Sequence, residues 1–203
     1  MLQAIVDVDV ASRAGWDPVD LARAYLDGGA RFLQVRAKHL ASGPLLALCD
    51  AVVHAASAFD AAVIVNDRID LARMSGAAGV HVGQEDLRPR EARAQLGPAI
   101  VGLSTHTRPQ IEQAVDEPVT YVAVGPVFGT ATKDTGYQAV GLDLVRVART
   151  LVPPPIGIVA IGGITLENAR SVLDAGASMV AVIGDLLVGD PATRVAAYCR
   201  AGL

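Results

Sequence analysis

Three polar residues occupy alternate positions at the end of one predicted strand: Gln34, Arg36 and Lys38. Because successive side chains of a strand point to opposite faces, these three share one face. The neighbouring Phe32 and Leu33 are large and apolar, which favours a buried strand over a solvated strand end. An amide, a guanidinium and an ammonium that converge inside a protein need an anion, and a phosphate group provides one.

Two acidic residues follow the next two predicted strands. Asp67 comes directly after Asn66, and Asp86 ends the loop 83–86. Carboxylates after adjacent strands are well placed to share a divalent cation, and Mg²⁺ prefers one or two carboxylates completed by water and substrate phosphates. A second interpretation is equally open, in which both acids cap the helices that follow.

Ser104 and His106 stand at the end of the fifth predicted strand. The hydroxyl can donate a hydrogen bond to a phosphate oxygen, and the imidazole can donate or shuttle a proton. A structural role beside a helix cap is the alternative for His106. We expect His81, inside the preceding strand, to be a packed and hydrogen-bonded residue.

A long loop, 125–134, follows the sixth predicted strand and contains Thr130, Thr132 and Lys133. Long loops in compact domains are often functional, although a solvated surface loop is the alternative. The chain has 17 basic residues, and its two lysines are Lys38 and Lys133. In a chain that otherwise uses Arg, both positions are candidates for ligand contacts.

Glycines follow the last two predicted strands, as Gly162-Gly163 and as Ile183-Gly184. Glycines before a helix let backbone N–H groups approach an oxyanion. In many barrels the loops after strands seven and eight form a phosphate site. Tight turns between a strand and a helix also use glycine, so this feature supports the phosphate interpretation without establishing it.

These positions depend on short apolar runs rich in Val and Ile, which we interpret as strands buried on both faces. The runs are 3–7, 32–36, 62–66, 79–83, 100–104, 120–125, 157–161 and 179–183. Helical patterns lie between them. Asp17-Pro18 and Asp190-Pro191 each begin a helix, and Thr107 precedes another. Thr165 is expected to cap a helix that ends near Gly176.

Eight strands that alternate with helices predict right-handed βαβ units and a parallel sheet. At about 25 residues per unit, we expect an α/β fold in which residues 1–203 form a single-domain (β/α)8 TIM barrel. A doubly wound open sheet is the alternative. In a barrel, all the polar residues named above lie at the carboxyl ends of strands, where barrel chemistry takes place.

Composition excludes several classes of protein. Apolar residues make up 52% of the chain, which supports a large core, and a net charge of −4 gives no sign of a nucleic-acid partner. The distant Cys49 and Cys199 do not suggest a disulfide framework and favour a cytoplasmic location. We expect no signal peptide and no membrane partner, because no apolar run approaches the ~18–20 residues that span a bilayer.

The order and spacing of six segments resemble the thiamine phosphate synthase family over nearly the whole chain. The segments are GGARFLQVRAKH, IVNDRIDLA, GAAGVHVGQEDL, VGLSTH, YVAVGPVFGTATKDT and VAIGGITLENA. The resemblance implies a transferase of thiamine biosynthesis. Such an enzyme joins an aminopyrimidine diphosphate to a (carboxy)thiazole phosphate and releases pyrophosphate. It also implies Mg²⁺ as cofactor and small molecules as partners, and it leaves a homo-oligomer open.

The resemblance further implies roles for residues of this chain. The pyrimidine diphosphate is expected to be held by Gln34, Arg36, Lys38 and Asn66, and the Mg²⁺ by Asp67 and Asp86. Contacts to the pyrophosphate are expected from Ser104 and Lys133. The thiazole phosphate is expected to be held by Thr130, Thr132, Gly163, Ile183 and Gly184. The residues expected to assist the chemical step are Arg36, Lys38, Ser104 and Lys133.

This sequence departs from the family pattern at three places. The first strand lacks a Tyr that is frequent in the family, Gly184 stands where Ser is common, and Gly129 stands where Pro is common. Any contact from Gly184 must therefore come from its backbone. None of the three departures removes a charged group.

The implied reaction is an alkyl transfer in which the thiazole nitrogen attacks the pyrimidine methylene carbon. The departing pyrophosphate needs nearby cations, and no protein nucleophile is required. Three other interpretations stay open. They are a thiazole tautomerase of the same fold that uses His106, a Schiff-base aldolase that uses Lys133, and a phosphate-ligand binding protein without activity.

Overall fold

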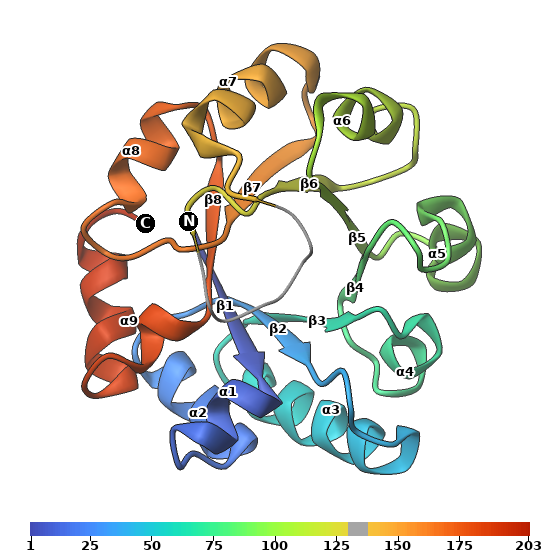
Figure 1. Ribbon diagram of the computed structural model, residues 1–203. Coiled ribbons are helices and arrows are strands. Elements are labelled where there is room, and N and C mark those ends of the chain that lie inside the picture. The colour runs from blue at the N-terminus through green and yellow to red at the C-terminus, as the bar shows by residue number, and fades with distance from the viewer. Residues whose placement is uncertain (130–137) are drawn as a thin grey trace.

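Eight parallel strands form a closed barrel in the computed structural model, within residues 1–129 and 138–203, which are those that the structure describes. Helices surround the barrel (Figure 1). Strands β8 and β1 pair through Leu2 with Val180 and Ala4 with Val182, so the sheet has closed on itself. The predicted (β/α)8 barrel is confirmed and the open sheet is wrong. The strands are β1 (Leu2–Asp7), β2 (Phe32–Arg36), β3 (Ala62–Asn66), β4 (Gly79–Val82), β5 (Ile100–Thr105), β6 (Tyr121–Val124), β7 (Gly157–Ile161) and β8 (Met179–Val182).

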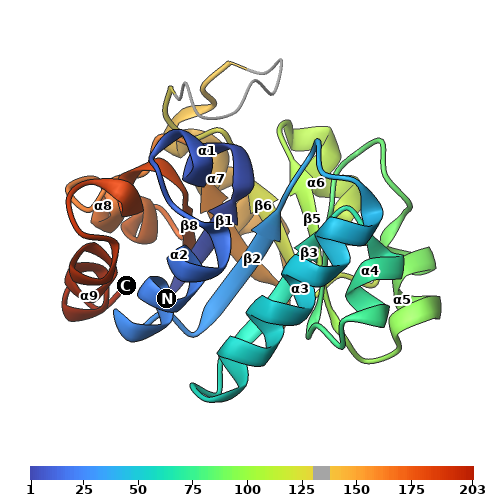
Figure 2. The ribbon, with the colours of Figure 1, turned by 90° about the horizontal axis from the view of Figure 1, so that it is seen from below.

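The helices follow the strands in the predicted alternation. They are α1 (Val8–Arg13), α2 (Pro18–Asp27), α3 (Ser42–Ser57), α4 (Ile69–Met74), α5 (Pro89–Leu96), α6 (Arg108–Ala114), α7 (Gly141–Leu151), α8 (Ala169–Asp174), the 3₁₀ turn η1 (Gly184–Leu187) and α9 (Pro191–Arg200). The short helix α1 lies over the end of the barrel at which β1 finishes (Figure 2). In the described ranges no helix is both long and apolar enough to cross a bilayer.

Side-chain caps fix most of the predicted helix starts. The carboxylate of Asp17 accepts from the backbone N–H groups of Val19 and Asp20 at the start of α2, and Asp190 accepts from Thr193 at the start of α9. The prediction that a helix starts right after Thr165 is wrong, because α8 begins at Ala169. The preceding turn is held by Asn168, whose Oδ1 accepts from the N–H of Thr165 at 2.9 Å.

The alternation of side chains along the strands divides the apolar core of the described residues into two parts. Outward-facing residues such as Val6, Val65 and Val122 pack against the helices. Inward-facing residues such as Ile5 and Ile64 pack against one another inside the barrel. Both faces of the strands are therefore buried, which explains why their sequences read as continuous apolar runs.

Polar side chains replace the apolar interior in one layer of the barrel. Gln3 is 1% exposed and donates from Nε2 to the hydroxyl of Tyr121 at 3.4 Å. His81 Nδ1 lies 2.8 Å from the same hydroxyl, and the two rings stack with their centroids 5.6 Å apart. Gly102 leaves room for this pair, since a Cβ there would lie 2.1 Å from Cζ of Tyr121 and 2.6 Å from Nδ1 of His81.

This close approach predicts a large effect from one methyl group. Gly102→Ala should lower the free energy of unfolding by about 1–3 kcal/mol, because the added carbon overpacks the stacked rings. Gly43→Ala is the matched control, since a Cβ at Gly43 in α3 meets nothing within 4 Å. Urea unfolding followed by circular dichroism measures both variants. Equal stabilities for the two variants would contradict the proposed crowding.

Candidate active site

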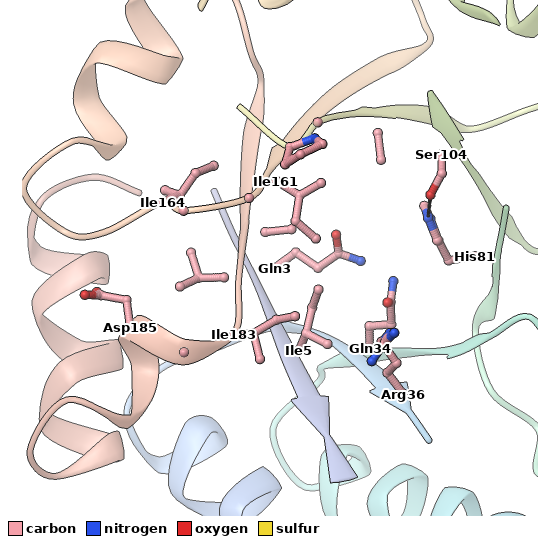
Figure 3. Close-up of a pocket in the computed structure, with 18 of the residues that line it drawn as sticks. Gln3, Ile5, Gln34, Arg36, His81, Ser104, Ile161, Ile164, Ile183 and Asp185 are labelled. Atoms are coloured by element: carbon pink, nitrogen blue, oxygen red, sulfur yellow. Dashed lines mark hydrogen bonds between the residues drawn. The ribbon is translucent and has the colours of Figure 1, made fainter. Parts of the chain in front are cut away.

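A cavity of about 410 Å³ lies at the carboxyl ends of the strands (Figure 3). Its lining includes many residues that the sequence analysis selected: Gln34, Arg36, Asn66, Ser104, Gly163, Ile183 and Gly184. They come from β2, β3 and β5 and from the turns after β7 and β8. Barrel closure therefore brings residues that are 150 positions apart in sequence to one cavity, as Gln34 and Gly184 illustrate.

The guanidinium of Arg36 is fixed by a buried acid. Asp7 and Arg36 are direct partners in the β1–β2 ladder, and their side chains form an ion pair. The Asp7 carboxylate is 2% exposed and also accepts from the N–H of Val10 at 3.1 Å, so it caps α1. Among the described residues, Nε of Arg36 is buried without a hydrogen-bond partner. The guanidinium thus keeps donor capacity beside the cavity, which suits an anionic ligand.

Lys38 lies apart from Gln34 and Arg36 because β2 ends at Arg36. Its Nζ does not line the cavity in the described part of the chain, and it donates to Oδ2 of Asp67 at 2.5 Å. The predicted trio therefore separates into two cavity residues and one cation at the neighbouring acid. The interpretation of this strand end as fully solvated is wrong for Gln34, which is 4% exposed.

The two predicted metal ligands lie in contact. Asp86 lies close enough to Asp67 to change the pKa of that carboxyl, and Oδ2 of Asp86 accepts from the N–H of Gly83 at 2.7 Å. Burial raises the pKa of Asp67; its hydrogen bond with Lys38 lowers that pKa, and Asp86 raises it further. A second carboxyl group this close disfavours ionisation of Asp67, and Lys38 is the cation that opposes this effect.

The alternative role of these acids as helix caps is wrong. The cap positions of α4 and α5 are Arg68 and Arg88, and neither helix start has a side-chain cap. Asp67 instead adopts a backbone φ of 64°, which is uncommon for a residue other than glycine. Such a conformation places the carboxylate toward Lys38 and Asp86 and away from the helix that follows.

Ser104 is oriented by a chain of polar contacts across the barrel. Its Oγ lies 2.8 Å from Nε2 of His81, whose other ring nitrogen contacts Tyr121. Burial raises the pKa of Tyr121, so its hydroxyl stays protonated. The expectation that His81 is packed and hydrogen-bonded is confirmed, and the residue also lines the cavity. His106 lines the cavity too, with Nδ1 2.6 Å from the carbonyl of Gly125.

The glycines after β7 are required by the backbone. Gly162 and Gly163 have φ values of 102° and 62°. A Cβ at Gly163 would lie 2.6 Å from the carbonyl oxygen of Gly129, and one at Gly162 would lie 2.5 Å from Cα of Pro126. The turn after β7 therefore packs directly on the segment after β6, and their backbones form one wall of the cavity.

Other lining residues were not selected from the sequence. They include Gln3, Ile5, Ala123, Ile161, Ala181 and Asp185. Alternation along β1 offered a signal for Gln3, because it shares the inward face with Ile5 and Asp7. No comparable signal existed for Asp185. Thr130, Thr132 and Lys133 lie outside the described residues.

The family described as thiamine monophosphate synthase matches residues 3–186. The thiamine-phosphate synthase of Koribacter versatilis is 43% identical over 205 residues, which cover 98% of this chain and 94% of that protein. The thiamine-phosphate synthase of Thermus thermophilus is 40% identical, with 94% and 93% covered.

Solved structures agree. The thiamine phosphate pyrophosphorylase of Pyrococcus furiosus superposes with a TM-score of 0.88 at 28% identity, covering 98% of this chain and 93% of that one. A 3-hexulose-6-phosphate synthase, at 17% identity and a TM-score of 0.69, is similar in fold alone. The match over residues 3–186 and the 43% identity to a relative of nearly equal length place this chain in the thiamine monophosphate synthase family.

Proposed function

We propose that this chain is a transferase that condenses an aminopyrimidine diphosphate with a (carboxy)thiazole phosphate to give thiamine phosphate and pyrophosphate. One observation carries the proposal. A single cavity has Gln34 and Arg36 on one wall and the glycine backbones after β7 and β8 on another, with apolar residues such as Ile5 and Ile161 between them. Two anion-binding walls around an apolar centre suit two ring substrates that each bear phosphate.

The residues of this chain would act by binding and orientation. The guanidinium of Arg36, held by Asp7, would receive the diphosphate and stabilise it as it departs. The carboxamide of Gln34 would hydrogen-bond the pyrimidine ring, and Ser104 would donate to the leaving group. Holding both substrates in one cavity turns a bimolecular encounter into a reaction between fixed partners. No covalent bond to the protein is needed.

The pair Asp67–Asp86 is the proposed Mg²⁺ site. Hard carboxylate oxygens suit this ion, and a cation would relieve the repulsion between two acids that lie in contact. Within residues 1–129 and 138–203 no cluster of three or more His, Cys, Asp or Glu side chains forms. The remaining ligands would therefore be water and substrate oxygens. When bound, the ion would supply charge neutralisation for the departing diphosphate.

The tautomerase alternative finds no support among the relatives named above, which are named thiamine-phosphate synthases or thiamine phosphate pyrophosphorylase. Neither the aldolase nor the inactive binding protein explains the paired acids beside Lys38. The cytoplasmic location stays a prediction.

The direct test mixes the purified chain with both substrates and Mg²⁺. Thiamine phosphate and pyrophosphate should appear in equal amounts, measured by liquid chromatography and by a coupled pyrophosphate assay. Rearrangement of the thiazole without pyrophosphate release would favour a tautomerase. Absence of both products would reject the proposed function.

The proposed Mg²⁺ site predicts a loss of activity when either carboxylate is removed. Asp67→Asn or Asp86→Asn should lower kcat/KM by about 100-fold or more, because the leaving group loses the charge of the ion. Asp143→Asn is the matched control, since Asp143 lies on the surface with 92% of its side chain exposed. Isothermal titration with Mg²⁺ and pyrophosphate checks binding without turnover. Unchanged magnesium affinity in both site variants would contradict the assignment.

The buried ion pair between Asp7 and Arg36 predicts how pyrophosphate changes the stability of the protein when Asp7 is replaced. Asp7→Asn keeps a capping side chain but leaves Arg36 without its anion, so the free energy of unfolding should fall by about 3 kcal/mol. Pyrophosphate should restore part of this loss by replacing the missing charge. The increase in Tm on adding pyrophosphate should therefore be larger in Asp7→Asn than in the wild type. An equal increase in both proteins would show that pyrophosphate does not bind at Arg36.

A further inference from the structure

Asp185 lies in the turn that begins at Gly184 and is one of the residues that line the cavity, while its carboxylate points away from the other lining residues (Figure 3). Its side chain is 8% exposed. The carboxylate accepts two hydrogen bonds from Arg194, Nε to Oδ2 at 3.0 Å and Nη2 to Oδ1 at 2.9 Å. Oδ2 also accepts from the hydroxyl of Tyr198 at 2.6 Å. Helix α9 thus supplies both a guanidinium and a phenol to this one acid.

The same carboxylate joins the two turns on this side of the cavity. Oδ2 of Asp185 accepts from the N–H of Leu166 at 3.2 Å, so the turn after β8 is tied to the segment after β7. Arg194 adds a second connection to the segment after β7, because its Nη2 also donates to Oε1 of Glu167 at 3.1 Å. The glycine backbones of both turns, Gly163 and Gly184, line the cavity. Asp185 therefore holds together the wall proposed for the thiazole phosphate.

An acid at this position poses an electrostatic problem. Asp185 belongs to the turn proposed to hold a phosphate, and an uncompensated carboxylate so near would repel this ligand, strongly where water is largely excluded. Arg194 compensates this charge through an ion pair with two hydrogen bonds, and the hydrogen bond with Asp185 also raises the already high pKa of the guanidinium. Burial and Asp185 raise the pKa of Tyr198, so the phenol stays protonated and donates.

We propose that Arg194 is a positioning residue that neutralises Asp185, and that this neutralisation lets the turns after β7 and β8 accept the phosphate monoester of the thiazole substrate. The inference rests on the proposed function, which puts a phosphate monoester at this wall. It assigns a role to α9, which reaches the cavity through Asp185. Arg194 acts through its partner and need not touch the substrate itself.

The test compares three variants by steady-state kinetics. Arg194→Met leaves the acid uncompensated and should raise KM for the thiazole phosphate about tenfold or more, with kcat changed far less. The double variant Asp185→Asn, Arg194→Met removes both charges and should return KM to within about threefold of the wild type. Arg170→Met is the control, because Arg170 pairs with Asp174 on the surface of α8.

A second readout isolates the phosphate. The thiazole alcohol without phosphate is used as a competitive inhibitor, and its inhibition constant should be the same in the wild type and in Arg194→Met. If Arg194 only held the two turns in position, the result would differ, because the double variant loses every hydrogen bond that Arg194 makes. KM would then stay raised in the double variant, and this result would overturn the proposal even if Arg194→Met failed to fold.

Binding of inorganic phosphate, followed by the ³¹P line width, separates this inference from the proposed function. If the wild type makes no thiamine phosphate, the proposed function fails, but phosphate binding that is lost in Arg194→Met and regained in the double variant still supports the inference. If the wild type is active and Arg194→Met has unchanged KM and unchanged phosphate binding, the inference alone fails.

Discussion

Closure of the barrel by the β1–β8 ladder is the constraint on which the site depends. Once Leu2 pairs with Val180 and Ala4 with Val182, every strand of the barrel ends at the same rim. The alternation of side chains then decides which residues enter the cavity and which pack under the helices. Gln34 and Arg36 enter it from β2, while Val35 between them belongs to the outer core. A slip of one residue in this register would exchange the two sets.

Acids hold the cations of this rim in place. Arg36 pairs with Asp7, Lys38 with Asp67 and Arg194 with Asp185, and in each case the partner comes from another element. A buried cation without such a partner would be costly to desolvate. Of these three cations Arg36 lines the cavity, so the pairing lets a chain with a net charge of −4 keep a positive group at the proposed anion site. The arrangement also leaves donor capacity on Arg36, where Nε has no partner among the described residues.

The part of the fold that follows local rules was predictable from the sequence. The continuous apolar runs predicted the strands, and polar residues at strand ends predicted part of the cavity wall, including Gln34, Arg36 and Ser104. Lys38 was placed less well, because it lies beyond the end of β2, where alternation no longer fixes direction. The predicted start of α8 was wrong because the side chain of Asn168 forms hydrogen bonds that hold a turn before the helix begins. Asp185 had no signal, since its partners Arg194 and Tyr198 are contributed by a different helix.

Asp7 has two roles that link the folding of the first strands to the formation of the site. The same carboxylate caps α1 and anchors Arg36, its neighbour in the β1–β2 ladder. The guanidinium of Arg36 is therefore held in place only when β1 and β2 have paired, so the start of the first helix and one side of the anion site depend on the same carboxylate.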